Sequence, residues 1–248
     1  GGETEDLLAA HTLLTGPVRD TAPHTVVESR TAHGSRPDTT IDPIVIAAAV
    51  VGRLQSIVAR EIAPRQSAVV TVGRIQAGTA NNVIPATAEL GLSVRSTTGE
   101  VQDQIVTAIR RIVAGECAAA GAPTEPEIRI VKSMPATVND TATARRIAQT
   151  HREMFGATHV IDPGPAMGSE DFSELALGPD GTSIPYHYWF LPSTTTAVWD
   201  AAPGASPLEK FAKVPSAHSP HFTPAPAVID QGVAAMTGAV LTELNQPT

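Results

Sequence analysis

The sequence predicts an α/β protein in which a small α+β domain is inserted into a larger, partial α/β domain. Between His24 and Lys132, strand-like and helix-like periodicities follow in the order strand, helix, strand, strand, helix, strand, which is that of a ferredoxin-like split βαβ domain. Residues 1–23 and 134–248 flank this small domain, which spans 24–133. The flanking segments contain few strand-like stretches, so they predict only part of an α/β layer structure.

The first strand and the first helix of the small domain are predicted from their boundaries. Residues 24–29 form the strand. The helix begins after Asp42, because an acidic residue is a favoured N-cap and Pro43 occupies the favoured first turn. Helical spacing gives this helix a predicted core face of Ile46, Val50, Leu54, Ile57 and Val58.

Three further strands and a second helix complete the small domain. Residues 68–75 and 87–95 are predicted strands, and alternation in the latter places Arg95 on its polar face. A helix follows from about residue 100 to 119, where isoleucines and valines recur at helical spacing. Residues 127–131 form the last strand. We therefore expect two helices on one face of a four-stranded sheet.

The segment after the small domain has a different pattern. A helix is predicted at residues 140–155, followed by a Gly/Pro-rich stretch at 163–168. The apolar, aromatic run 184–191 predicts a buried strand, and residues 194–216 predict an irregular surface loop. A last helix is expected at about 227–244.

Composition excludes several classes of protein. The net charge is -8 and no run of Lys or Arg occurs, which argues against a nucleic-acid partner. The longest apolar stretches are well short of the ~20 residues that cross a bilayer, so we expect no membrane span. The only cysteine, Cys117, cannot form an internal disulfide. A reducing, cytoplasmic location is the expectation.

Two loops of the small domain carry candidate polar residues. His33 stands in Thr-Ala-His-Gly-Ser-Arg-Pro, where Gly34 and Pro37 shape a tight connection and leave the imidazole able to point away. A solvated loop histidine is the alternative. The link at 77–85 contains paired asparagines, which are typical of a hairpin turn and also suit recognition of a carbonyl or carboxylate.

Three further positions combine charge or metal affinity with a loop or strand end. Arg95 matches a carboxylate through two parallel hydrogen bonds, although a solvated surface Arg is the commoner case. The stretch 167–173 contains adjacent acids, which either orient a substrate or cap the following helix through Ser169. His218 and His221 lie in a loop, and imidazole is a common zinc ligand. A catalytic zinc site needs about three protein ligands, so His218 requires partners from elsewhere.

In their order and spacing, these loops resemble the hippurate hydrolase, aminoacylase and auxin-conjugate hydrolase family of dinuclear metal-dependent amidohydrolases, which are metallopeptidases. The resemblance extends from about Gly16 to the C-terminus. The motifs that carry it are Ala32-His33-Gly34-Ser35 with Pro37, Asp42-Pro43, Leu54-Gln55, Ala77-Gly78, Asn82-Val83-Ile84-Pro85, Val94-Arg95, Ser169-Glu170-Asp171-Phe172 and His218-Ser219-Pro220.

The resemblance implies roles for individual residues. The small domain corresponds to a lid that mediates homodimerisation, and His33 to the lid histidine that stabilises the oxyanion, across the dimer in some members. Asn82 and Arg95 would bind the carbonyl and the carboxylate of the substrate. His218 would be a metal ligand. Ser169 and Glu170 would contribute to substrate binding from a loop beside the active site.

The resemblance also implies a reaction. Two divalent ions, whether zinc, manganese, cobalt or nickel, polarise an amide carbonyl and activate a bridging water, with a glutamate as general base and acid. The family's other metal motifs lie N-terminal to the lid, and nothing before Gly16 resembles them. We therefore expect an amidohydrolase of N-acyl or aroyl amino acids whose N-terminal metal-binding half is missing from this chain, which would be inactive alone. The alternative is a noncatalytic dimerisation or binding fragment.

Overall fold

The structure is a computed structural model of the 248-residue chain. It describes residues 9–10, 19–162, 164, 166–168, 170–217 and 219–246, with only the backbone described for residues 9, 10, 19 and 20. The chain forms two compact units. We call Pro17–Ala136 with Met167–Glu174 the sheet unit, and Gly1–Gly16, Thr137–Ala166 and Leu175–Thr248 the flanking unit. The domain boundaries expected at 23/24 and 133/134 stay predictions.

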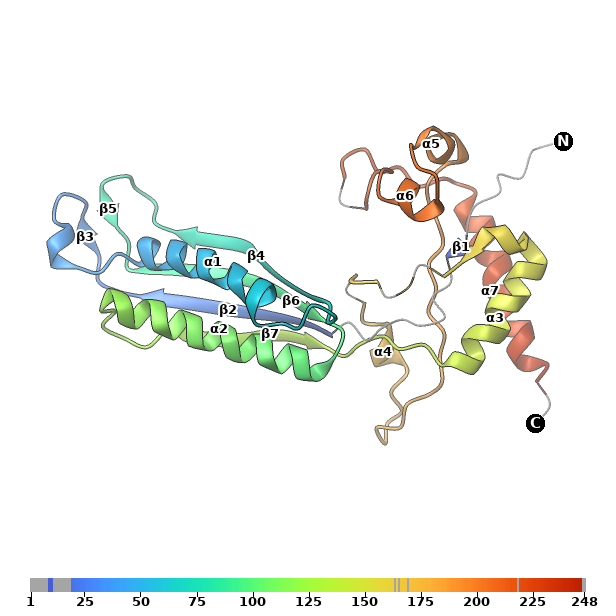
Figure 1. Cartoon of the computed structure of the whole chain (residues 1–248), viewed down its shortest axis with the longest axis horizontal. Helices are drawn as coiled ribbons and strands as arrows, with labels where there is room; N and C mark the ends of the chain where they lie inside the picture. Colours follow the sequence, from blue (N-terminus) through green and yellow to red (C-terminus); the bar gives the residue numbers. More distant parts are fainter. Residues whose placement is uncertain are drawn as a thin grey trace. The chain divides into compact units, whose positions relative to one another are not determined.

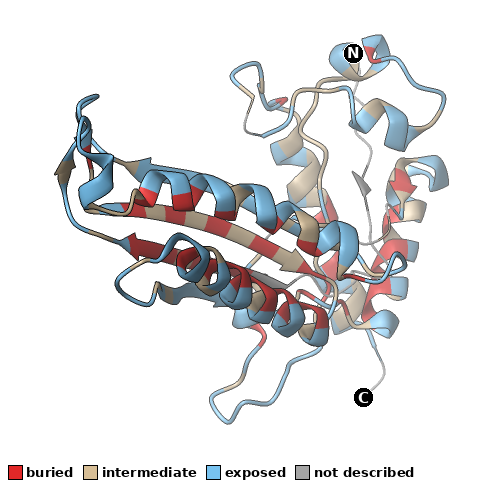
Figure 2. Ribbon diagram, turned by 60° about the vertical axis from the view of Figure 1, so that its left-hand side comes forward, coloured by how far each residue is buried: buried red, intermediate tan, exposed pale blue. Residues whose placement is uncertain are grey.

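The sheet unit contains a four-stranded antiparallel sheet with two helices. The strand order in space is β4-β6-β2-β7. Along the chain the elements are β2 (Arg19–Glu28), α1 (Pro43–Arg60), β4 (Ala68–Ala77), β6 (Thr87–Ser96), α2 (Gly99–Ala120) and β7 (Glu127–Met134). Figures 1 and 2 show α1 and α2 side by side over one face of the sheet. The predicted split βαβ order is confirmed.

The core of the sheet unit lies between the helices and this covered face. Every second residue of β6 is buried, as the alternation predicted. The buried side chains of α1 include Ile46, Val50, Leu54 and Ile57, whereas Val58 is 37% exposed, so its placement on the core face was wrong. Val58 follows directly after Ile57, and the next position of a helix is turned by about 100°.

Capping residues begin and end the two helices of the sheet unit. The Asp42 side chain accepts a hydrogen bond from the amide of Ile44, as expected of an N-cap. Thr98 caps α2 in the same way, and Gly121 ends it with a φ of 72°. The first strand begins earlier than predicted, at Arg19. The register of its pairing with β7 shifts between Ala22 and Pro23, so the alternation of side chains is interrupted and does not predict the first half of the strand.

The helix α1 is unusually apolar for its length. Among the described residues, it is the one helix long and apolar enough to match a membrane span by length and composition. Its apolar face is buried in the core of the sheet unit. Packing against a sheet therefore accounts for its hydropathy, because a helix that packs on a protein core can be as long and as apolar as a membrane span.

The flanking unit is built around two packed helices, α3 (Thr141–Phe155) and α7 (Val228–Leu244). Its small parallel pair joins β1 (Ala9–Ala10) to β8 (Val160–Ile161). Residues 194–216, predicted to be an irregular loop, contain the short helices α5 (Thr196–Ala201) and α6 (Pro207–Phe211). Their N-caps are Thr195 and Ser206, which the loop prediction overlooked.

The buried strand predicted at 184–191 is wrong. No strand runs through these residues, all of which are described. Instead, the Asn139 side chain donates to the carbonyl oxygen of Tyr188 at 2.8 Å and accepts from the amide of Tyr188 at 2.6 Å. The amide of Asp140 donates to the carbonyl of Tyr186 at 2.8 Å. The Asn139 side-chain amide therefore makes the hydrogen bonds to the backbone of Tyr188 that a neighbouring strand would otherwise make.

Candidate functional site

His33 and Asn82 are brought together beyond one end of the sheet. The two-residue strands β3 (Ala32–His33) and β5 (Val83–Ile84) pair antiparallel, with His33 opposite Val83. The amide of Gly34 donates to the carbonyl of Asn82 at 2.7 Å. A Cβ on Gly34 would come within 3.2 Å of the Asn82 backbone, so glycine permits this close approach. Figure 1 shows β3 and β5 grouped at this end of the sheet unit.

The hydrogen bonds of His33 define which ring nitrogen can donate. Its Nδ1 accepts the amide of Ser35 at 3.2 Å and lies 2.8 Å from the Ser35 hydroxyl. A backbone amide can only donate, so Nδ1 is the acceptor and the neutral ring carries its hydrogen on Nε2. His33 is exposed. The loop therefore presents an N–H donor to solvent, which is the group required to stabilise a developing oxyanion.

Arg95 lies at the other end of the same sheet. The chain passes from β5 into β6, whose ten residues rise roughly 3.3 Å each, so the two ends of this strand are about 30 Å apart. Arg95 is the ninth residue of that strand. Within one chain, the structure therefore brings His33 to Asn82 but does not bring either residue to Arg95.

Glu170 has a local structural contact. Its Oε1 accepts the amides of Asp171 at 3.0 Å and of Phe172 at 3.2 Å, which caps the short helix α4 (Phe172–Leu175). The sequence suggested such a cap through Ser169, which lies outside the described residues. The predicted Ser169 cap therefore stays a prediction, and the cap that the structure describes is the carboxylate of Glu170.

The described residues do not provide a metal centre. No group of three or more His, Cys, Asp or Glu side chains in the described part of the chain could hold a metal ion. His218, the predicted ligand, lies outside the described residues. Near it in the sequence, the amide of Ser219 donates to the carbonyl of Ser216 at 2.8 Å. The described residues do not fit a dinuclear centre, and we derive no catalytic step through a metal.

Two buried histidines of the flanking unit were missed by the sequence analysis. His151 is fully buried, and its Nε2 lies 2.8 Å from the carbonyl oxygen of Ala235 in α7, to which it donates. The rings of His151 and His187 lie 5.4 and 5.5 Å from that of Trp189. The burial of His151 could have been predicted from helical spacing, because it continues the apolar face of α3 one turn after Ile147.

Both buried imidazoles favour the neutral form. Burial lowers the pKa of His151, and its hydrogen bond to Ala235 partly opposes this change. Burial, and then the nearby His151, lower the pKa of His187 to about 4. These histidines are therefore neutral near pH 7 and contribute to packing.

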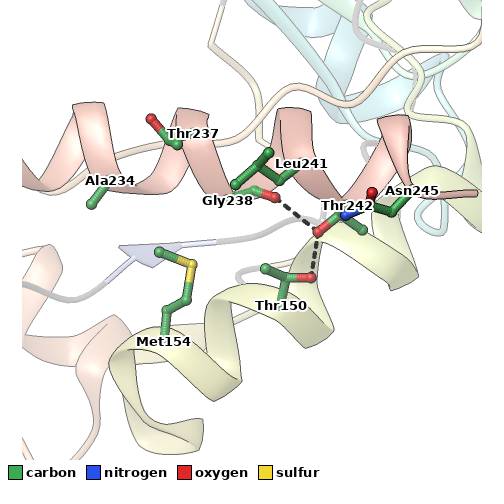
Figure 3. Close-up of a pocket in the computed structure, with 8 residues that line it drawn as sticks. All are labelled: Thr150, Met154, Ala234, Thr237, Gly238, Leu241, Thr242 and Asn245. Carbon is green, nitrogen blue, oxygen red and sulfur yellow. Dashed lines mark hydrogen bonds between the residues drawn. The ribbon is translucent and has the colours of Figure 1, made fainter.

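A groove of about 450 Å³ lies between α3 and α7 (Figure 3). It is lined by Thr150, Met154, Ala234, Thr237, Gly238, Leu241, Thr242 and Asn245. The hydroxyls of Thr150 and Thr242 are 2.6 Å apart. None of the lining side chains is a carboxylate, imidazole or amine, so this groove lacks an acid or base for catalysis.

Comparison with known proteins identifies the family. Residues 23–120 match the peptidase dimerisation domain of the M20 family. An IAA-amino acid hydrolase ILR1-like 2 from Arabidopsis thaliana is 34% identical over 67% of this chain, and the hippurate hydrolase of Campylobacter jejuni is 35% identical over 59% of it. The chain belongs to the M20 amidohydrolase family. The matched domain lies within the sheet unit, so the predicted resemblance is confirmed.

The match to complete M20 proteins is partial. The alignments cover 37% and 38% of the lengths of those two relatives. An amidase of the hydantoinase/carbamoylase family from Burkholderia vietnamiensis has a similar fold, with a TM-score of 0.69 at 16% identity. That comparison covers 96% of this chain and 51% of the amidase chain, and it supports the fold alone.

Proposed function

We propose that this chain acts in a metal-dependent amidohydrolase that cleaves the amide bond of N-acyl or aroyl amino acids. The observation that carries the proposal is the hydrogen-bonded His33, whose Nε2–H is exposed on a domain of the M20 dimerisation type. The names of two M20 relatives, an IAA-amino acid hydrolase and a hippurate hydrolase, describe hydrolases of such conjugates. They support this substrate class.

His33 would act on the carbonyl of the scissile amide. Its Nε2–H would donate to the carbonyl oxygen as negative charge develops there. Asn82, held beside it, offers a side-chain amide donor to the same carbonyl. Loss of one such donor typically lowers kcat by roughly 10²–10³-fold. Arg95 and Glu170, and Ser169 next to Glu170, remain the proposed substrate-binding residues.

The separation of His33 from Arg95 favours a homodimer. One small conjugate cannot reach both ends of a strand of about 30 Å. We propose that the His33 end of one copy and the Arg95 end of another form one site. The edge strand β4 exposes Val69 and Ile75, and α1 exposes Val45, which provides an edge and apolar surface for a second copy.

The metal and the location of the protein remain proposals. M20 hydrolases are generally metal-dependent, and His218 is our proposed ligand for a divalent ion, whether zinc, manganese, cobalt or nickel. The remaining donors would come from outside the described residues. We further propose a cytoplasmic location, which the single buried Cys117 supports.

The test is hydrolysis by protein expressed from the whole gene. Hippurate and a series of N-acetyl amino acids are supplied with each of the four metals, and release of the free amino acid is measured. We expect release with at least one metal, and a His33→Gln variant with kcat reduced roughly 10²-fold. His24→Gln, on the same domain, is the matched control. Absence of release with every metal would contradict the proposal.

A noncatalytic dimerisation or binding module is the second candidate. It is favoured by the absence of a metal cluster among the residues that the structure describes. We expect the 248-residue chain by itself to form dimers and to give no appreciable turnover after metal is added, because those residues cannot hold two ions. Sedimentation measures the first property, and the amino acid release assay the second. Appreciable turnover by this chain would contradict that expectation.

A further inference from the structure

Arg95 binds a segment that is distant in the sequence. Its Nη1 donates to the carbonyl oxygen of Met167 at 2.6 Å, across 72 residues of chain. The donor carries a charge and the distance is short, so this bond is stronger than one between neutral groups. Arg95 is half-buried on the sheet face opposite α1 and α2. Its guanidinium therefore serves a contact within the sheet unit.

The bound segment belongs to the sheet unit although the flanking unit surrounds it in sequence. The chain enters the sheet unit at Met167 and leaves it after Glu174. We call residues 167–174 the strap; all of them except Ser169 are described. Ser173 is 7% exposed, so the strap is packed as well as hydrogen-bonded. Arg95 thus contacts the strap at the point where it joins the sheet unit.

The strap presents acidic side chains in a locally ordered turn. Glu170 caps the start of α4, and Asp171 is exposed beside it. The carbonyl of Asp171 accepts the amide of Glu174 at 2.9 Å. These local bonds fix the shape of the strap, whereas the Arg95 bond links its first residue to β6.

We propose that Arg95 anchors the strap to the sheet unit, so that the carboxylates of Glu170 and Asp171 are carried by the sheet unit and do not follow the flanking unit. This task differs from the recognition of a substrate carboxylate. A carbonyl needs one donor, which a lysine also supplies, whereas two parallel hydrogen bonds to a carboxylate need the planar guanidinium. The two tasks can therefore be separated by substitution.

The first experiment is hydrogen exchange of the strap amides in the 248-residue chain. We expect Arg95→Met to speed exchange at residues 171–174 roughly ten- to a hundred-fold, as loss of the charge-assisted bond to Met167 implies. Arg95→Lys should stay within about two-fold of the parent chain, because it keeps a donor. Arg74→Met is the matched control, since Arg74 lies on the same sheet and bonds to His24 and Gln76.

Three outcomes would overturn the anchor. They are unchanged exchange in Arg95→Met, equal acceleration in Arg95→Lys and Arg95→Met, and equal acceleration of strap and β4 amides in Arg95→Met. The last would indicate general loosening of the sheet unit. None of these measurements needs catalytic activity, so failure here would leave the proposed amidohydrolase function standing.

A Glu-specific protease provides an independent measurement. Glu170 and Glu174 are the strap's cleavage sites, and a protease cuts there faster when the strap opens locally more often. We expect cleavage there to be roughly ten- to a hundred-fold faster in Arg95→Met, with the parent rate in Arg74→Met. An unchanged rate at both glutamates in Arg95→Met would contradict the anchor.

Discussion

The two units of this protein are stabilised in different ways. The sheet unit buries one large apolar cluster that includes Leu54, Leu90 and Ile105. The described part of the flanking unit has a cluster of only Ala148 and Val160. It instead buries the imidazoles of His151 and His187 around Trp189. Patterned apolar burial therefore dominates the first unit, and specific polar and aromatic contacts are prominent in the second.

The surface of α7 reinforces the contrast. Six large apolar side chains of this helix are exposed: Ile229, Val233, Met236, Val240, Leu241 and Leu244. Exposed apolar side chains also occur on α1, but its opposite face is fully buried in the core. On α7 the buried residues are the small Ala235, Gly238 and Ala239. The flanking unit therefore gains less from apolar burial per helix than the sheet unit does.

The largest expected effect is a cavity in the sheet unit. Leu54→Ala should lower the free energy of unfolding of this unit by roughly 3–5 kcal/mol, because Leu54 is fully buried between α1 and the sheet. The measurement is urea unfolding followed by reaction of the buried Cys117 with a disulfide reagent. Gln55→Ala, at an exposed position of α1, is the control and should change this energy by less than about 0.5 kcal/mol.

The second largest effect we expect is a loss of stability of the flanking unit at acidic pH. The pKa of His187 is lowered to about 4 in the folded protein, and a histidine in the unfolded chain titrates near 6.5. The unfolded chain therefore binds more protons between these values. Stability of the flanking unit should be fully present above pH 6.5 and be lost as the pH falls towards 4, by up to about 3 kcal/mol. The lowered pKa of His151 acts in the same direction.

The environment of these histidines makes the pH effect local. Phe155 approaches His151 from α3, the carbonyl of Ala235 from α7, and Trp189 with His187 from the segment after Ile184. The chain has two tryptophans, so Trp199→Phe leaves Trp189 as the single fluorescent probe. We expect its emission to report acid unfolding while Cys117 stays protected. Simultaneous exposure of both probes would show that the units do not unfold independently.

Sequence reasoning predicted most of the sheet unit because its period is regular. Alternation in β6 and helical spacing in α1 give the same core that the structure shows. It failed where one partner is remote. Tyr188 pairs with the side chain of Asn139, 49 residues away, where the sequence predicted a strand. No pattern in the residues near Tyr188 indicates this contact.

The candidate site shows the same limit. The turn chemistry of Gly34 and Asn82 is local, and the structure brings their loops together as a short strand pair. The polar-face position of Arg95 was also predictable from alternation. Its partner Met167 was not, because a main-chain carbonyl carries no residue-specific signal. The metal role of His218 stays a prediction, since it lies outside the described residues.

The smallest effect we predict concerns the polar contacts of the flanking unit. Asn139→Ala removes one donor and one acceptor that pair with the backbone of Tyr188, and Asn139 is 5% exposed. Leaving these part-buried backbone groups of Tyr188 unpaired should lower the stability of this unit by about 2 kcal/mol. Trp189 fluorescence during urea unfolding measures the change. Gln149→Ala, an exposed residue of α3, is the control. If Asn139→Ala behaves like this control, the polar pairing does not stabilise the flanking unit, and the proposed contrast between the units is wrong.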